Sequence, residues 1–413
     1  MKHKREAQTS EPKDGRRQDM PRILVLDASQ RSALAVVRSL GKKNMHVTAA
    51  DHIPSTLAGA SRYAREAVCY ADPSREPGRF LDNIGAIVRR IGVDIVIPTT
   101  DLTSMLLVAE PGSVGNARLA APSRDSYEQL TDKGALVDIA RRLGLPVPAT
   151  QLARSRGEIE AAATDLGFPL VLKPSRSRYR KGERVISTAV SIVRTPDELP
   201  GRLARLSWLE DIPCLVQQFI PGHGAGIFAL YGGDRPIAWF AHRRIREKPP
   251  SGGVSVLSES VPIDSRMQAT ATRLLEAARW RGIAMVEFRV TPEGTAHIME
   301  VNGRFWGSLQ LAIDSGVDFP WLLCQLTNDA AGPVLPQPSY TLGRRLRWLL
   351  GDVDNLLLQV RSNELAGSGK LAALGHFLGS FVDPACRQEV LRWTDPLPGL
   401  REARDWVAGV LRQ

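Results

Sequence analysis

The segment from Gly282 to Gly307 constrains the fold of this chain more than any other, because its pattern predicts a β-hairpin. Two apolar runs flank the tetrapeptide Thr291-Pro292-Glu293-Gly294, in which proline second and glycine fourth fit a type I turn. If these four residues form the loop, Val290 faces Thr295 and the rest of the register follows. That register decides which side chains share a face of the hairpin.

Three metal-ligand candidates then fall on one face. Glu287 lies opposite Ile298, and Glu287, Glu300 and Asn302 all point to the side of Ile298. Glu287 and Glu300 become diagonal neighbours, roughly 7–8 Å apart. Two carboxylates and an amide oxygen suit Mg²⁺ (or Mn²⁺), and Arg304 follows as a cation for phosphate or carboxylate. The alternative is a hairpin whose polar residues only face water, although Glu is disfavoured within strands.

Composition describes a globular protein of about two to four structural units. The four cysteines (Cys69, Cys214, Cys324, Cys386) form no CxxC pair, which argues against a disulfide framework or structural zinc and fits a reducing compartment. Residues 1–20 are charged and lack the apolar core of a secretory signal, so we expect a disordered tail on a cytoplasmic protein. No apolar stretch approaches the length of a transmembrane segment.

The net charge of +10 raises nucleic acid as a partner. The basic residues are spread along the chain among 44 acidic ones, and the dense cluster is at residues 176–184. A generic basic surface, or an anionic small substrate, explains this balance better. We therefore predict no nucleic-acid partner.

Residues 22–122 alternate short β-rich runs with helical patterns, which predicts a parallel α/β sheet. The turn after the first strand contains no glycine, so the pattern argues against a nicotinamide-binding Rossmann site. The tripeptide Thr99-Thr100-Asp101 follows a strand, at the edge where such sheets bind ligands. It is a candidate for substrate contact.

Two lysines and a basic segment follow. Lys133 lies near the start of a helical segment at residues 126–143, where a cation could reach a phosphate. Lys173 ends a strand at residues 169–173, and the polar, basic residues 174–183 are expected to form a mobile flap over a polyphosphate. The alternative for each is a solvated surface. A helix is expected at residues 195–208, and a strand at residues 214–220.

Beyond the strand-like runs at residues 226–261, Arg243 and Arg244 are candidates to meet a substrate carboxylate, and Ser251-Gly252-Gly253 could close over it. Residues 326–335 are rich in Ala, Gly and Pro and indicate a boundary. Helical patterns follow at residues 344–360, 371–381 and 401–411, which predicts a helical extension packed on the core. The cationic start of the first of these, with Trp348, leaves contact with a membrane surface as an alternative.

The order of these features resembles the ATP-grasp superfamily, notably its biotin carboxylase and carbamoyl phosphate synthetase type. The resemblance covers about residues 22–325, and its most specific part is MEVNGR at residues 299–304. It implies an α/β fold, α+β in the ATP-grasp part. It also implies the division into a tail at 1–20, a Rossmann-like pre-ATP-grasp domain at 21–121, an ATP-grasp domain at 122–325 and a C-terminal helical extension at 326–413.

The resemblance implies ATP and Mg²⁺ as cofactors and gives roles to the residues that match. Glu287 and Glu300 would bridge the metal ions, and Asn302 would join the second ion. Lys133 and Lys173 would contact the phosphates of ATP.

It also implies an adenine site and an acyl phosphate site. Gln217 lies where the family has an acid that reads the adenine amino group, and an amide oxygen can still accept that hydrogen bond. The backbones of Gln218 and Ile220 would line the adenine edge, with His223 or its neighbours near the ribose. Arg304 would bind the transferred phosphoryl group or the acyl phosphate.

The sequence differs from the family pattern at two places, and these differences limit which reactions the resemblance implies. The flap has only Gly182 in place of a glycine-rich run, and FWGSLQLA at residues 305–312 replaces a catalytic acid and histidine. The second departure argues against biotin carboxylation.

The predicted function is ATP-dependent ligation, in which a small-molecule carboxylate is activated as an acyl phosphate and an amine displaces phosphate. A non-catalytic ATP-binding module with a sensing or scaffolding role is the alternative, and a nicotinamide enzyme is a third. The acid and the amine cannot be identified from these residues. The resemblance is also compatible with a homodimer.

Overall fold

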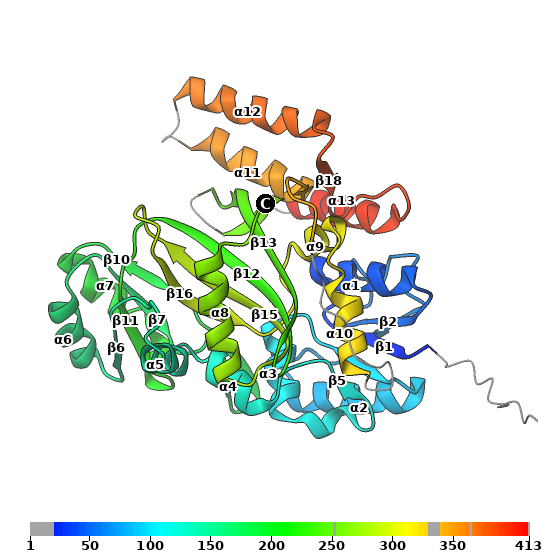
Figure 1. The fold of residues 1–413 in the computed structure, drawn as a ribbon, viewed down its shortest axis with the longest axis horizontal. Coiled ribbons are helices and arrows are strands. Elements are labelled where there is room, and N and C mark those ends of the chain that lie inside the picture. The colour runs from blue at the N-terminus through cyan, green and yellow to red at the C-terminus, as the bar shows by residue number, and fades with distance from the viewer. Residues whose placement is uncertain (1–19, 251–252, 329–338, 363–365, 412–413) are drawn as a thin grey trace, which may run out of the picture.

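The computed structural model describes residues 20–250, 253–328, 339–362 and 366–411 (Figure 1). The expected tail, most of the boundary at 326–335 and Ser251-Gly252 of the closing loop lie outside these residues. In the part that is described, no helix combines the length and hydropathy needed to cross a bilayer. All four cysteines are free.

The N-terminal layer is a five-stranded parallel sheet in the order β3-β2-β1-β4-β5, which confirms the prediction from the alternating pattern. Its central strands β1, β2 and β4 are largely buried, which agrees with their mostly apolar sequences, whereas the edge strands β3 and β5 are largely exposed. The elements are β1 (Arg22–Val25), α1 (Arg31–Lys42), β2 (His46–Asp51), β3 (Glu66–Cys69), α2 (Pro77–Ile91), β4 (Ile95–Ile97), α3 (Asp101–Ala109) and β5 (Arg118–Leu119).

Two helices lead to a four-stranded antiparallel sheet in the order β10-β7-β11-β6. One face packs on α6 through Leu170, Leu172 and Cys214, and the other face carries Lys173 and Gln217. The helix expected at 195–208 is instead one short helix between two 3-10 turns. The elements are α4 (Arg124–Thr131), α5 (Lys133–Arg142), β6 (Thr150–Ala153), α6 (Arg156–Leu166), β7 (Leu170–Pro174), β10 (Ser191–Val193), α7 (Leu199–Leu203) and β11 (Cys214–Gln218).

The basic segment predicted to be a mobile loop forms a hairpin of β8 (Arg178–Lys181) and β9 (Arg184–Ser187), which we call the flap. The prediction is wrong because Tyr179 is buried and donates a hydrogen bond of 2.6 Å to Asp211. Lys181, on the same face, donates to the same carboxylate.

The large sheet has seven strands in the order β16-β15-β12-β13-β14-β17-β18. Helices α9 and α10 pack it against the N-terminal layer through a shared core that includes Phe228, Phe240 and Trp306, and α8 covers part of the other face. The elements are β12 (His223–Gly232), β13 (Pro236–Lys248), β14 (Val254–Ser260), α8 (Ser265–Ala277), β15 (Arg281–Val290), β16 (Ala296–Asn302), α9 (Leu309–Ser315) and α10 (Phe319–Thr327).

The C-terminal segment contains β17 (Arg345–Arg347), α11 (Leu349–Arg361), α12 (Gly367–Val382), β18 (Cys386–Gln388) and α13 (Leu397–Val410). The helix predicted from Arg344 is wrong at its start, because those residues form β17 and extend the large sheet. Trp348, on which the membrane alternative rested, lies under Arg31 and donates to Glu402. The division into domains at 121 and 325 stays a prediction.

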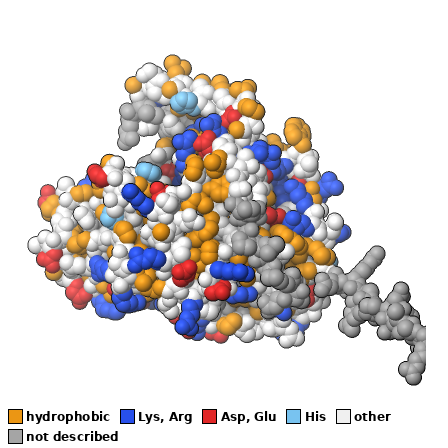
Figure 2. All heavy atoms as spheres, viewed as in Figure 1, with side chains coloured by type: hydrophobic (Ala, Val, Ile, Leu, Met, Phe, Trp, Pro, Cys, Tyr) orange, Lys and Arg blue, Asp and Glu red, His pale blue; other side chains and the backbone are white. Residues whose placement is uncertain are grey.

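Hydrophobic side chains are gathered at the top of the molecule, where α12 lies (Figure 2). Leu371, Leu378 and Val382 of α12 are all exposed. Elsewhere on this face basic and acidic side chains are interspersed, as expected for a generic basic surface.

Candidate active site

The central hairpin brings its two glutamates closer than predicted. Gly294 adopts φ of 87° and Thr291 N–H donates to the Thr295 carbonyl, so Val290 pairs with Ala296 instead of Thr295. A β-bulge beside Phe288 then places Glu287 directly opposite Glu300. The predicted register is therefore wrong, and the carboxylates are direct cross-strand neighbours.

The same correction moves Ile298 away from these acids. It pairs with Phe288, and both side chains are buried in the core on the other face of the hairpin. Glu287 and Glu300 therefore share their face with Asn302 but not with Ile298.

Asn302 joins the carboxylates. Its Nδ2 donates to Oε1 of Glu287 at 3.1 Å and to Oε1 of Glu300 at 3.3 Å. Burial, reinforced by the charge of Glu300, raises the pKa of Glu287 to about 7. Among the described residues no three His, Cys, Asp or Glu cluster as a metal site, but two carboxylates are oxygen donors that fit Mg²⁺. The amide of Asn302 would add its oxygen to this set once turned over, because its Nδ2 faces the carboxylates in this structure.

Both predicted lysines approach these acids. Lys133 begins α5, and its Nζ donates to Ser177 Oγ at 2.8 Å and lies 3.5 Å from Glu300 Oε2. Lys173 is 9% exposed at the end of β7. Burial lowers the pKa of Lys173 to about 8, although the negative charge of Glu300 opposes that shift. A cluster of two cations and two carboxylates therefore lies between the two antiparallel sheets.

Arg304 is also in the cluster, but its side chain is already held. Its Nε and Nη2 donate to the two carboxylate oxygens of Asp101 at 3.0 and 3.1 Å. Nη1 donates to the Phe305 carbonyl, and Nη2 also reaches Asn302 Oδ1 at 3.4 Å. Asp101 fixes this arginine from the N-terminal layer, and its contact with substrate stays a prediction.

The residues predicted to bind adenine and the ribose lie on β11, just after it and at the start of β12. Gln217 is 2% exposed, its Nε2 donates to Thr150 Oγ1 at 2.9 Å, and its Oε1 is buried without a partner in the described structure. Gln218 N–H donates to the Ala149 carbonyl, and the Ile220 carbonyl accepts from Arg289 Nε at 3.2 Å. His223 is exposed at the first position of β12. An orphaned acceptor at Gln217 fits an adenine amino group.

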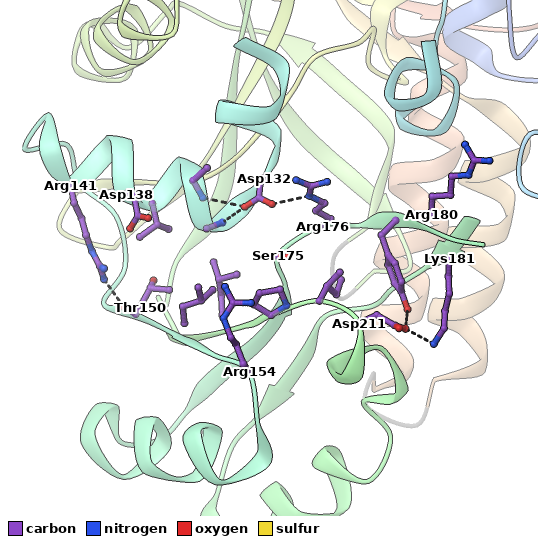
Figure 3. Close-up of a pocket in the computed structure, with 18 residues that line it drawn as sticks. Asp132, Asp138, Arg141, Thr150, Arg154, Ser175, Arg176, Arg180, Lys181 and Asp211 are labelled. Atoms are coloured by element: carbon purple, nitrogen blue, oxygen red, sulfur yellow. Dashed lines mark hydrogen bonds and ion pairs between the residues drawn. The ribbon is translucent and has the colours of Figure 1, made fainter. Parts of the chain in front are cut away.

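Two cavities meet at the start of α5. One, of about 90 Å³, is lined by Lys133, Glu300 and Asn302. The other, of about 730 Å³, lies between α5, β6 and the flap (Figure 3). Asp132 and Arg176, which form a 2.9 Å ion pair, line both. The larger cavity therefore lies beside the carboxylates and not on them.

Two further arginines, predicted to meet a substrate carboxylate, also have partners within the chain, and their contact with substrate stays a prediction. Arg244 Nη2 donates to Glu287 Oε2 at 3.3 Å, and Arg243 Nε donates to Glu259 at 2.7 Å. Sequence reasoning did not single out Ser177 or the role of Asp101. The signal for Asp101 was its place after a strand, but nothing in the local sequence indicates Ser177.

Comparison with known proteins shows which family and which folds this chain resembles. A family model described as ATP-grasp in the biosynthetic pathway with Ter operon matches residues 211–349. The chain is 27% identical over 270 residues to the carbamoyl phosphate synthase large chain of Deinococcus radiodurans, which covers 63% of this chain and 25% of that one. The chain spans less than half the length of the first curated relatives it matches.

Two solved structures show the same fold. A biotin carboxylase–βγ-ATP complex from Campylobacter jejuni has a TM-score of 0.60 at 18% identity, covering 78% of this chain and 74% of that one. The biotin carboxylase domain dimer of Hydrogenobacter thermophilus 2-oxoglutarate carboxylase, with ADP magnesium salt and bicarbonate, has a TM-score of 0.59 at 15% identity. It covers 79% of this chain and 73% of that one.

Proposed function

We propose that this chain, a member of the ATP-grasp superfamily, is an ATP- and Mg²⁺-dependent ligase that activates a substrate carboxylate for attack by an amine. The observation that carries the proposal is the cross-strand pair Glu287–Glu300. Lys133 of α5 and Lys173 of β7 approach this pair from the four-stranded sheet and its neighbouring helix. The relatives named as synthases and carboxylases support the same reaction class.

Glu287, Glu300 and the amide oxygen of Asn302 would hold Mg²⁺. When bound, the metal would neutralise charge on the phosphate oxygens of ATP. The raised pKa of Glu287 supports this assignment, since desolvation and the negative charge of the neighbouring Glu300 both disfavour its ionised form, and a bound cation would offset them. The ADP magnesium salt in the Hydrogenobacter neighbour is a parallel in another protein.

Lys133 and Lys173 would bind the polyphosphate, and Gln217 Oε1 would accept from the adenine amino group. Lys173 has a pKa of about 8, so its side chain is charged in most protein molecules at pH 7. Gln218 and Ile220 would line the adenine edge through their backbones. His223 would contact the ribose. Because His223 is exposed, this contact would lie nearer to solvent than the contacts made by Gln217.

In the reaction a substrate carboxylate oxygen would attack the γ-phosphorus, the bond to the β,γ-bridging oxygen would break, and ADP would leave. The amine nitrogen would then attack the acyl carbon, lose a proton and expel phosphate. Arg304, held by Asp101 beside the carboxylates, would supply a fixed positive charge against the developing negative charge.

The test is ADP release with a panel of small carboxylates and amines. Glu300→Gln should lower the rate by roughly 10²–10³-fold, the loss typical when one charge-stabilising group is removed. Glu293→Gln, in the exposed turn of the same hairpin, is the matched control and should keep the wild-type rate. Tight ATP binding without ADP release for any pair would instead favour a non-catalytic ATP-binding module.

The oligomeric state and the substrates are the subject of two further proposals. A homodimer is supported by the dimeric Hydrogenobacter neighbour, and sedimentation equilibrium would test it. The substrates are small molecules in this proposal, which a metabolite screen coupled to phosphate release would identify.

A further inference from the structure

The small cavity lies where the flap meets α3, α4 and the end of β16. Its volume is about 90 Å³, and Glu300 and Asn302 form part of its wall. A pocket for a whole drug-sized ligand needs roughly 300–1,000 Å³. This cavity therefore suits one small group, next to the residues proposed to hold the metal.

Each acidic side chain that lines the cavity already has a cation within 3.5 Å. The pairs are Asp101–Arg304 at 3.0 Å, Glu128–Arg124 at 3.0 Å, Asp132–Arg176 at 2.9 Å and Glu300–Lys133 at 3.5 Å. The cavity therefore has no unpaired negative charge among the described residues.

Three cations line the cavity, and one of them is unpaired. Lys133 is bonded to Ser177 and Arg176 to Asp132, whereas the side chain of Arg178 has no hydrogen bond or ion pair with any described residue. Arg178 is nevertheless half-buried. Although burial favours the neutral acid, the charges of Arg304 and Arg178 hold the pKa of Asp101 below its usual range. A half-buried guanidinium without a partner, at the wall of a small cavity, is suited to bind an oxyanion such as a carboxylate or a phosphate.

Arg304 cannot supply that contact in its present position. Its Nε and Nη2 are both on Asp101, and Nη1 donates to a backbone carbonyl. Nη2 also donates to Asn302 Oδ1 at 3.4 Å, so four of the five N–H groups of the guanidinium are used and one remains, too few for a second two-point contact.

The flap holds Arg178 over the cavity from several sides. Tyr179 and Lys181 bond to Asp211, while Val185 N–H donates to the Ser74 carbonyl of the N-terminal layer at 2.8 Å. Residues alternate along β8, so Arg178 points away from the face bonded to Asp211. The hairpin therefore presents Arg178 to the cavity without using it as a structural contact.

We infer that Arg178 binds the reacting oxyanion beside Glu300 and Asn302, the contact that the sequence pattern had placed on Arg304. The oxyanion is the γ-phosphate of ATP or the substrate carboxylate. This inference rests on the proposed function and makes Arg178 a further ligand-binding residue of the same site.

The experiment uses the full chain and isothermal titration. One arm measures the affinities for MgADP and for the magnesium salt of the β,γ-imido analogue of ATP. The other titrates acetate onto protein saturated with that analogue. Arg178→Ala is compared with Arg178→Lys, which keeps the charge but loses the paired N–H donors of the guanidinium. The control is Arg184→Ala, which removes an exposed arginine of the same flap. Thermal unfolding checks that each variant is folded.

A loss of roughly tenfold or more for the analogue, with ADP unchanged, assigns the oxyanion to the γ-phosphate. A similar loss for acetate alone assigns it to the substrate carboxylate, and Arg178→Lys should fall between Arg178→Ala and wild type in either case. If acetate binds to no variant, the nucleotide arm decides alone.

The inference is overturned if Arg178→Ala matches Arg184→Ala in every titration. It is also overturned if Arg178→Ala weakens ADP and the analogue equally, because that is a general effect of charge. A wild-type protein that binds neither nucleotide would contradict the proposed function itself.

Discussion

Gly303 illustrates how packing decides residue identity inside the candidate site. A Cβ atom at this position would lie 2.9 Å from the ring of Trp280 and 3.1 Å from that of Tyr127. Trp280 is fully buried and Tyr127 nearly so, and neither can give way cheaply. The chain can therefore pass from the metal-facing Asn302 to Arg304 beside Asp101 only with glycine between them.

His242 should make the stability of the protein depend on pH. It is buried on β13, stacked on Phe228, and burial followed by the charge of Arg244 lowers its pKa to about 3. The unfolded chain takes up a proton below about pH 6.5, whereas the folded chain does not until about pH 3. Stability is therefore lost as the pH falls through this window, by about 2 kcal/mol between pH 7 and pH 5.

Urea unfolding at the two pH values tests this. The free energy of unfolding of His242→Gln should fall less from pH 7 to pH 5 than that of wild type, by about the same 2 kcal/mol. His376→Gln, at an exposed position on α12, should keep the wild-type pH dependence. If both variants and wild type lose stability in parallel, His242 is not held neutral.

The three proposed metal ligands were predictable because a turn signal and alternation along two adjacent strands are local properties. Their register was not, because it depends on the left-handed backbone at Gly294 and on the bulge beside Phe288. The partner of Arg304 was harder still, since Asp101 lies 203 positions away in another layer. Contacts of that range are set by how layers pack, which local pattern does not encode.

The flap shows the same limit for a whole element. Its composition is polar and basic, which resembles a solvated loop, yet two of its residues converge on Asp211 and Val185 enters the core of the N-terminal layer. The anchoring groups come from residues 74 and 211, on either side of it in the sequence. An ordered flap with one unpaired arginine differs from the mobile loop expected, and it positions charge before any ligand binds.

Tyr179→Phe should loosen this element. It removes the hydroxyl that donates to Asp211 at 2.6 Å while keeping the buried ring, so the hairpin loses one anchor but not its packing. Amide hydrogen exchange within residues 178–187 should become several-fold faster, with the strands of the N-terminal layer unchanged. Tyr63→Phe is the control, and unchanged exchange in the flap would show that Lys181 and Val185 suffice to hold it.

The C-terminal segment contacts both the N-terminal layer and the large sheet. Arg38 of α1 is 2% exposed, its Nε donates to Asp395 at 2.8 Å, and its Nη atoms donate to the carbonyls of Glu389 and Val390. Residues 389–395 of the C-terminal segment therefore contact the N-terminal layer through a buried arginine and its partners. On the other side the same segment adds two strands to the large sheet.

The junction of that segment with the large sheet depends on Asp352, which is fully buried. Its carboxylate accepts from Arg246 at 2.7 and 2.6 Å and from Arg347 Nε at 2.6 Å. Arg347 is also fully buried, with its guanidinium 4.2 Å from the rings of both Phe377 and Phe381 of α12. Asp352 is thus the counter-charge of both arginines. Because Arg347 is fully buried, water cannot take the place of the carboxylate there.

Asp352→Asn should therefore destabilise the protein by about 3–5 kcal/mol, because it leaves buried guanidinium groups without a counter-charge. Asp354→Asn, which breaks the more exposed pair with Lys248, should cost less than about 1 kcal/mol. Urea unfolding at pH 7 measures both variants. Equal losses would mean that water reaches Arg347 once the carboxylate is gone, and the C-terminal segment would then be held chiefly by the pairing of β14, β17 and β18.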